Sequence, residues 1–123
     1  MAVTDTSKSG AERRRHPRAP ADWTVELALA GGTQRGRLRD VSRVGLSFHT
    51  EAPIPMMTVL AVALDLPVRG GRRRISGSGA VVRCQRISPA LEHYEVAVFL
   101  HDMSEADRAA LEAHVNGSLA GRR

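Results

Sequence analysis

The sequence predicts a mainly β protein, a six-stranded antiparallel β-barrel with a C-terminal α-helix and a flexible basic N-terminal arm. Two observations predict this class. Six segments between residues 22 and 101 show the period-two alternation of half-buried strands, with turn residues between them. The period then changes to that of a helix over residues 104–116. The length of 123 residues fits one domain with one core.

The two ends of the chain differ in composition from the predicted barrel. Residues 1–11 are small and polar, which predicts a disordered tail. Residues 12–21 contain four arginines together with Pro17 and Pro20, which favour an extended arm over a helix. At the other end, Asn116-Gly117 is a helix stop signal, so we expect residues 117–123 to form a loose tail.

The predicted strands follow one another at hairpin spacing across residues 22–101. In the first strand Trp23, Val25, Leu27 and Leu29 share one face, and Gly31-Gly32 predicts a hairpin after it. The return strand, about residues 33–41, places Arg35, Arg37 and Arg39 on one face. Further strands are predicted at about 44–49, 57–66, 72–86 and 94–101. Gly77 and Gly79 predict a bend or bulge in the longest of them.

The helix has a clear start signal. Ser104 is a favourable N-cap residue, and Asp107 follows three positions later in the manner of a capping box. Apolar side chains recur on one side at helical spacing: Met103, Ala106, Ala110, Leu111 and Val115. This pattern predicts a helix that packs on the barrel.

No motif in the sequence supports catalysis or metal binding. The five histidines are scattered and none is paired with a cysteine at ligand spacing, so we expect no metal site and no cofactor. Nucleophile-elbow and phosphate-loop motifs are missing, so we expect a protein that is not an enzyme. A single cysteine, no signal peptide and no membrane span predict a soluble, cytoplasmic protein.

The charge distribution favours an anionic partner. Residues 1–18 carry five basic and two acidic side chains, which accounts for +3 of the net charge of +5. A nucleic acid is one candidate, given the Arg35, Arg37 and Arg39 ladder. However, aromatic residues make up only 3% of the chain, which argues against binding single strands by stacking. A solvated outer face explains the ladder better, so nucleic acid is an unlikely partner.

The stretch "DVSRVG", residues 40–45, allows two interpretations. Asp40 and Ser42 point to the same side of an extended backbone, where either can cap a turn while Gly45 adopts an unusual φ. Alternatively, the two polar groups bind a ligand, since a carboxylate can accept hydrogen bonds from the Watson–Crick edge of guanine. In that case Gly45 lets the ligand approach the backbone.

The order and spacing of Arg13, Arg14 and Arg18 before "D-x-S-x-x-G" resemble the PilZ domain family of bacterial cyclic di-GMP receptors. The resemblance runs from about residue 12 to 115 and includes the final "YEVAVFLHDMS" strand. It implies a split-barrel domain over residues 12–116, with the arm at 12–21, the barrel at 22–101 and the helix at 104–116.

The same resemblance implies a role for each motif residue. Arg14 and Arg18 are expected to grip phosphate and guanine, while Asp40 and Ser42 bond guanine or orient the arginines. Gly45 is expected to hold the turn. Arg13 precedes the arginine pair, and in this family an arginine at that position tends to accompany a stacked pair of ligand molecules.

The resemblance makes a cyclic di-GMP receptor the leading functional hypothesis. In this hypothesis the ligand orders the arginine arm, and a downstream protein partner of unknown identity reads the ordered surface. Two alternatives remain open at this point: a PilZ-like protein–protein adaptor without nucleotide binding, and a small nucleic-acid-binding β-barrel.

Overall fold

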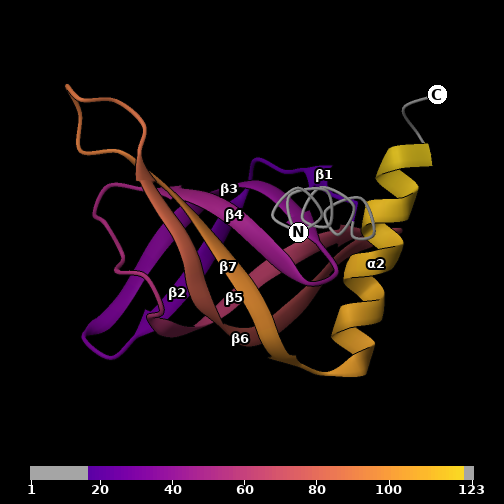
Figure 1. The fold of residues 1–123 in the computed structure, drawn as a ribbon. Coiled ribbons are helices and arrows are strands. Elements are labelled where there is room, and N and C mark those ends of the chain that lie inside the picture. The colour runs from indigo at the N-terminus through magenta and orange to yellow at the C-terminus, as the bar shows by residue number, and fades with distance from the viewer. Residues whose placement is uncertain (1–16, 121–123) are drawn as a thin grey trace, which may run out of the picture.

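The computed structural model describes residues 17–120, which contain seven strands and one helix. In chain order the elements are β1 (Ala19–Pro20), β2 (Thr24–Leu29), β3 (Gly32–Ser42), β4 (Gly45–Thr50), β5 (Val59–Val68), β6 (Gly71–Arg86), β7 (Tyr94–Met103) and α2 (Glu105–Ala120). The long strands wrap around one core, and α2 lies beside one end of them (Figure 1).

Six of the strands form a closed antiparallel ring. Its order is β3-β2-β5-β6-β7-β4, and a further pairing between β4 and β3 completes the circle. The ring confirms the predicted fold class, and each predicted strand lies within two residues of an observed one. The turn between β2 and β3 confirms the predicted hairpin, because Leu29 and Gly32 are paired across it and Gly32 has a φ of 138°.

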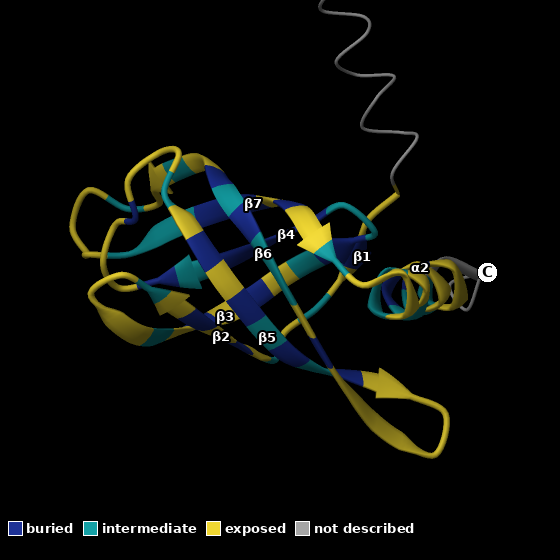
Figure 2. Cartoon of the chain, turned by 90° about the horizontal axis from the view of Figure 1, so that it is seen from below, coloured by how far each residue is buried: buried dark blue, intermediate teal, exposed yellow. Residues whose placement is uncertain are grey.

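The inside of the ring is filled by aliphatic side chains and one phenylalanine. Buried and exposed residues alternate along the strands, as period two requires (Figure 2). Phe48, Leu27, Leu46 and Leu64 are among the largest fully buried side chains. The arginine ladder on β3 points outward, also as predicted, with Gly36 and Leu38 on the buried side.

Two bulges interrupt β6 as it crosses β7, near the glycines that predicted a bend. The pairing register shifts between Ser78 and Gly79, and again between Val81 and Arg83. A Cβ atom on Gly79 would lie 2.2 Å from the carbonyl oxygen of Phe99, so only glycine permits this close approach of the two backbones.

Sequence reasoning did not predict a short seventh strand, β1. Ala19–Pro20 pairs with Val41 and Asp40 at the end of β3, and Ala19 is fully buried. Two residues of strand are too few to show a period, which is why β1 leaves no signal in the sequence. The last residues of the predicted flexible arm are therefore fixed to the barrel wall.

The helix begins as predicted and ends later than predicted. The backbone N–H of Asp107 donates to Ser104 Oγ (3.1 Å), which confirms Ser104 as the N-cap. The predicted end at residue 116 was wrong, because α2 continues to Ala120 and includes part of the expected loose tail. Gly117 does not adopt the left-handed φ that a glycine stop needs, so the helix passes through it.

The helix is fixed to the barrel by its apolar face. Leu111 and Val115 are buried in the common core, and the rings of His114 and Trp23 pack at nearly a right angle with centroids 5.6 Å apart. Within residues 17–120, the helix α2 is not long and apolar enough to cross a membrane.

Shortening Leu111 to alanine should destabilise the protein, because it leaves a cavity between α2 and the barrel. We expect Leu111→Ala to lower the free energy of unfolding by about 2–5 kcal/mol in urea denaturation. The matched control is Leu91→Ala, since Leu91 is 62% exposed. A change below about 0.5 kcal/mol is expected for the control. Equal effects of the two substitutions would contradict the docking of α2.

Candidate functional site

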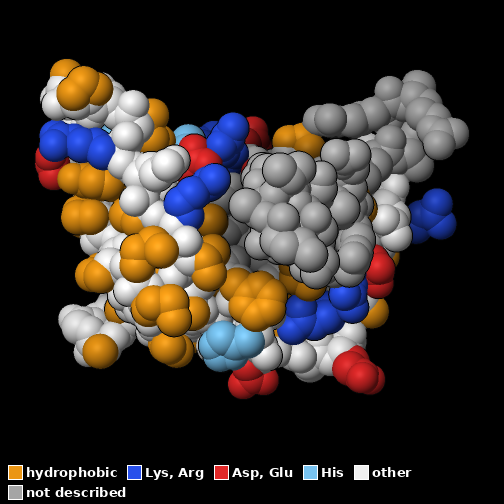
Figure 3. Space-filling model, in the orientation of Figure 1, with side chains coloured by type: hydrophobic (Ala, Val, Ile, Leu, Met, Phe, Trp, Pro, Cys, Tyr) orange, Lys and Arg blue, Asp and Glu red, His pale blue; other side chains and the backbone are white. Residues whose placement is uncertain are grey.

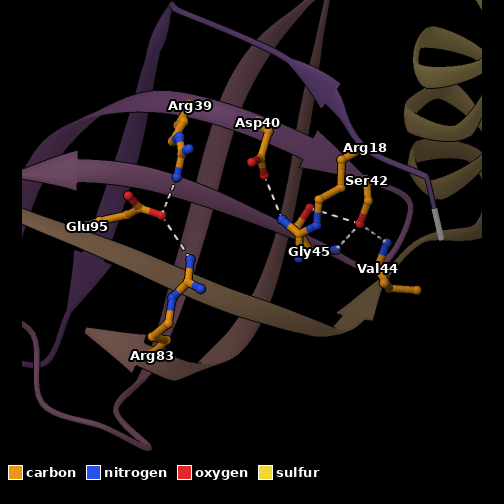
Figure 4. A network of polar contacts seen from close by, with 8 residues as sticks. All are labelled: Arg18, Arg39, Asp40, Ser42, Val44, Gly45, Arg83 and Glu95. Atoms are coloured by element: carbon orange, nitrogen blue, oxygen red, sulfur yellow. Dashed lines mark hydrogen bonds and ion pairs between the residues drawn. The ribbon is translucent and has the colours of Figure 1, made fainter. Parts of the chain in front are cut away.

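Arg18, at the base of the predicted arm, lies against the motif of residues 40–45 on the outer wall of the barrel. Arg18 Nη1 donates to Asp40 Oδ1 at 2.6 Å, and the two side chains are 44% and 23% exposed (Figure 4). The contact follows from the pairing of β1, in which Pro20 lies opposite Asp40. Arg18 precedes Pro20 by two residues, so its side chain lies on the same side of the strand as Asp40. The structure thus brings two of the predicted site residues together. Arg13 and Arg14 lie outside the described residues.

Ser42 supports the turn between β3 and β4. Its Oγ accepts hydrogen bonds from the backbone N–H of Val44 (3.2 Å) and of Gly45 (3.1 Å), and donates to the Gly45 carbonyl (3.3 Å). The residue is fully buried. This geometry is the serine turn anticipated from the sequence, and it uses the hydroxyl within the protein.

Gly45 is needed for space and not for backbone conformation. The expectation of an unusual φ was wrong, because the left-handed glycines of residues 17–120 are Gly32, Gly70 and Gly71. Gly45 is instead a regular β4 residue opposite Phe99, where a Cβ atom would lie 2.5 Å from the carbonyl oxygen of Val98. The glycine therefore lets β4 pack closely on β7.

The turn is also held from outside, by a residue that the sequence did not single out. Arg108 of α2 donates to the carbonyls of Arg43 (2.6 Å) and Leu100 (3.3 Å), and the N–H of Leu100 donates to the Val44 carbonyl (2.8 Å). Helix, turn and β7 are tied together by these bonds. Asp40 stands on β3 just before this turn.

A second group of charges lies on the same outer wall. Glu95 of β7 accepts from Arg39 Nη1 (2.6 Å) and from Arg83 Nη2 (2.9 Å), both on the same oxygen (Figure 4). Its other oxygen lies 3.7 Å from His49 Nε2. Sequence reasoning missed this group, since its members come from four strands and share no motif.

A hollow of about 870 Å³ lies elsewhere, over β2, β5 and β6 beside the start of α2, and it includes none of Arg18, Asp40, Ser42 and Gly45. Within residues 17–120, no three His, Cys, Asp or Glu side chains gather as metal ligands.

These features define a class of protein. A small closed barrel carries an arginine and a carboxylate side by side on its outer wall, at the base of a basic arm and next to a serine turn. Arginine forks of this kind recognise phosphates and the edge of guanine. The chain belongs to the PilZ domain family, whose model matches residues 12–117.

Solved structures of similar fold agree with this assignment. The chain is similar to the inhibitor of motility MotI/DgrA of Bacillus subtilis, with a TM-score of 0.79 and 18% identity over 90% of this chain. It covers 53% of that protein, about half its length. It is also similar to the PilZ domain of Escherichia coli YcgR with c-di-GMP, with a TM-score of 0.65, 18% identity and coverage of 90% of this chain and 95% of that one.

A third similar structure is that of Borreliella burgdorferi PlzA in complex with c-di-GMP, with a TM-score of 0.55 and 11% identity. The match covers 100% of this chain and 59% of PlzA. No curated protein matches the chain by sequence. At these identities the structural comparisons support the fold.

Adding a methyl group at Gly45 should destabilise the barrel at the β4–β7 contact. We expect Gly45→Ala to lower the free energy of unfolding by about 1–3 kcal/mol, because the Val98 carbonyl must move. The control is Gly117→Ala, where nothing lies within 4 Å of the added methyl. In a helix that change should stabilise by up to about 1 kcal/mol. Thermal and urea unfolding measure both, and an unchanged Gly45→Ala protein would refute the steric role.

Proposed function

We propose that this protein is a receptor for cyclic di-GMP that closes its arginine arm over the ligand on the outer wall of the barrel. The observation that carries the proposal is the 2.6 Å contact of Arg18 with Asp40, which joins the two halves of the sequence motif. Membership of the PilZ family supports it. So do the c-di-GMP complexes among the similar structures. No catalytic step is part of the proposed function.

Each motif residue has a distinct role in the proposed complex. Arg14 and Arg18 grip the phosphates and the O6/N7 edge of guanine, for which the arginine fork is well suited. Asp40 accepts from guanine or orients Arg18. Ser42, buried in its turn, and Gly45, packed on β7, act by shaping the wall on which Asp40 stands. Arg13 favours a stacked ligand pair.

The proposed output is recognition of the ligand-bound surface by a downstream protein partner, in the cytoplasm. An exposed apolar row next to the motif supports such a partner. Val59 pairs with Ala80 and Ala80 with Phe99, which lies opposite Gly45. Val59 is 64% and Phe99 49% exposed, and hydrophobic side chains gather on this face (Figure 3). Apolar groups that share one face in this way are typical of protein docking sites.

Isothermal titration of the full chain with cyclic di-GMP tests the proposal. We expect Arg14→Ala and Arg18→Ala each to cost about 2–4 kcal/mol of binding free energy, because a charge-assisted contact is lost. Asp40→Ala should also weaken binding. The control is Arg74→Ala. Arg74 is an exposed arginine near the start of β6, and it pairs with Glu26 and Asp65 and not with a residue of the motif.

Three results would contradict the proposal. Absence of binding by the wild-type chain at tens of micromolar ligand would favour the adaptor without nucleotide binding. Binding of duplex or single-stranded nucleic acid that falls steeply with salt would favour the nucleic-acid alternative. Wild-type affinity in Arg18→Ala would show that the ligand lies elsewhere.

A further inference from the structure

A row of short side chains crosses the outer wall between the two charged groups. Asp40 of β3 is paired with Ser47 of β4. Ser47 is paired with Ala97 of β7, and Ala97 with Arg83 of β6. The chain neighbours of Ser47 and Ala97 are buried in the core, so alternation turns both side chains outward. Asp40 and Arg83 therefore stand at the two ends of a floor made of one serine and one alanine, and Arg39 is the chain neighbour of Asp40.

Bulges in two different strands place the arginines on this wall. The register of β3 and β4 shifts between Leu38 and Asp40, so Arg39 and Asp40 both face outward although they are adjacent. The register of β6 and β7 shifts between Val81 and Arg83, which places Arg83 opposite Ala97. Bulges commonly re-aim side chains beside binding sites.

Glu95 holds the two arginines in this structure. The same oxygen of Glu95 accepts from both guanidinium groups, and its side chain is 16% exposed. Arg39 and Arg83 remain about half exposed. Each guanidinium has five N–H donors, so most of their donors are left over after one contact with Glu95. Two positive charges face one negative charge here, which leaves the group with a net charge of +1.

The floor itself contains a polar atom without a partner. Ser47 is 1% exposed, and its Oγ makes no hydrogen bond within the described part of the chain. Buried hydroxyl groups are normally hydrogen-bonded, so an unsatisfied one in the middle of the row needs an explanation. A polar ligand atom placed over Ser47 would give this hydroxyl a partner.

We infer that Arg39 and Arg83 form a second anion-binding pair that takes a phosphate of the ligand, with Glu95 as the group that holds them when no ligand is bound. The inference rests on the proposed function and extends the site across the wall from Asp40 to Arg83. The phosphate replaces Glu95 as the acceptor, and no bond other than hydrogen bonds is exchanged. Glu95 is thus a positioning residue that competes with the ligand.

Titration of the full chain with cyclic di-GMP separates this inference from the proposed function. We expect Arg39→Ala and Arg83→Ala each to weaken binding five- to thirtyfold, with unchanged melting temperatures. The affinity of Arg83→Ala should also depend less on salt than that of the wild type, because one phosphate contact is gone. Arg74→Ala is the control, since hydrogen bonds to Glu26 and Asp65 likewise engage its guanidinium and raise its pKa.

The Glu95→Gln variant tests the competition. It keeps the size of the side chain and removes the negative charge, so the arginines become freer to bind phosphate and affinity should rise two- to tenfold. Weaker binding by Glu95→Gln would show that Glu95 itself serves the ligand and would overturn the competing role.

The outcomes are distinguishable. One outcome is that the wild-type chain binds and Arg18→Ala binds more weakly, while Arg39→Ala and Arg83→Ala both bind like Arg74→Ala. The second pair is then refuted while the proposed function stands. If the wild-type chain gives no heat and no mobility shift with cyclic di-GMP, the proposed function fails and the inference fails with it.

Discussion

The pairing of β3 with three other strands is the constraint on which the rest of the structure depends. Its first half pairs with β2, its second half with β4 and β1, and the register shift at Arg39 lies where the partners change. The shift lets an 11-residue strand bend enough to close a ring of six. It also turns Asp40 toward solvent, so closure of the barrel and exposure of the carboxylate have one cause.

The same strand fixes the base of the arm. Ala19 is buried against β3, and Arg18 leaves the barrel beside Asp40. A partly exposed ion pair of this kind contributes at most about 1 kcal/mol to stability. This weak contact positions Arg18 but costs little free energy to break. A phosphate or a guanine edge could therefore replace Asp40 as the partner of Arg18. A weak contact of this kind suits the proposed receptor, in which the arm closes over the ligand.

The sequence predicted the features that depend on local patterns. Alternation located six strands, and Ser104 marked the start of α2. The remaining features arise from pairing between distant segments. Plain alternation puts Arg39 and Asp40 on opposite faces, and only the match of Leu38 with Phe48 and of Asp40 with Ser47 turns both outward. The carbonyl of Val98, far along the chain, gives Gly45 its role, so the motif alone suggested a different reason for it.

Charge explains why the arm and the wall would have to act together. Arg18, Arg39 and Arg83 carry three positive charges, while Asp40 and Glu95 carry two negative ones, which leaves +1 on the wall. Cyclic di-GMP brings two negative phosphates, so the wall alone cannot neutralise it. Arg13 and Arg14 add two positive charges from the arm. With one bound ligand molecule the charges of the proposed complex add up to +1, so the arm supplies the charge that the barrel lacks.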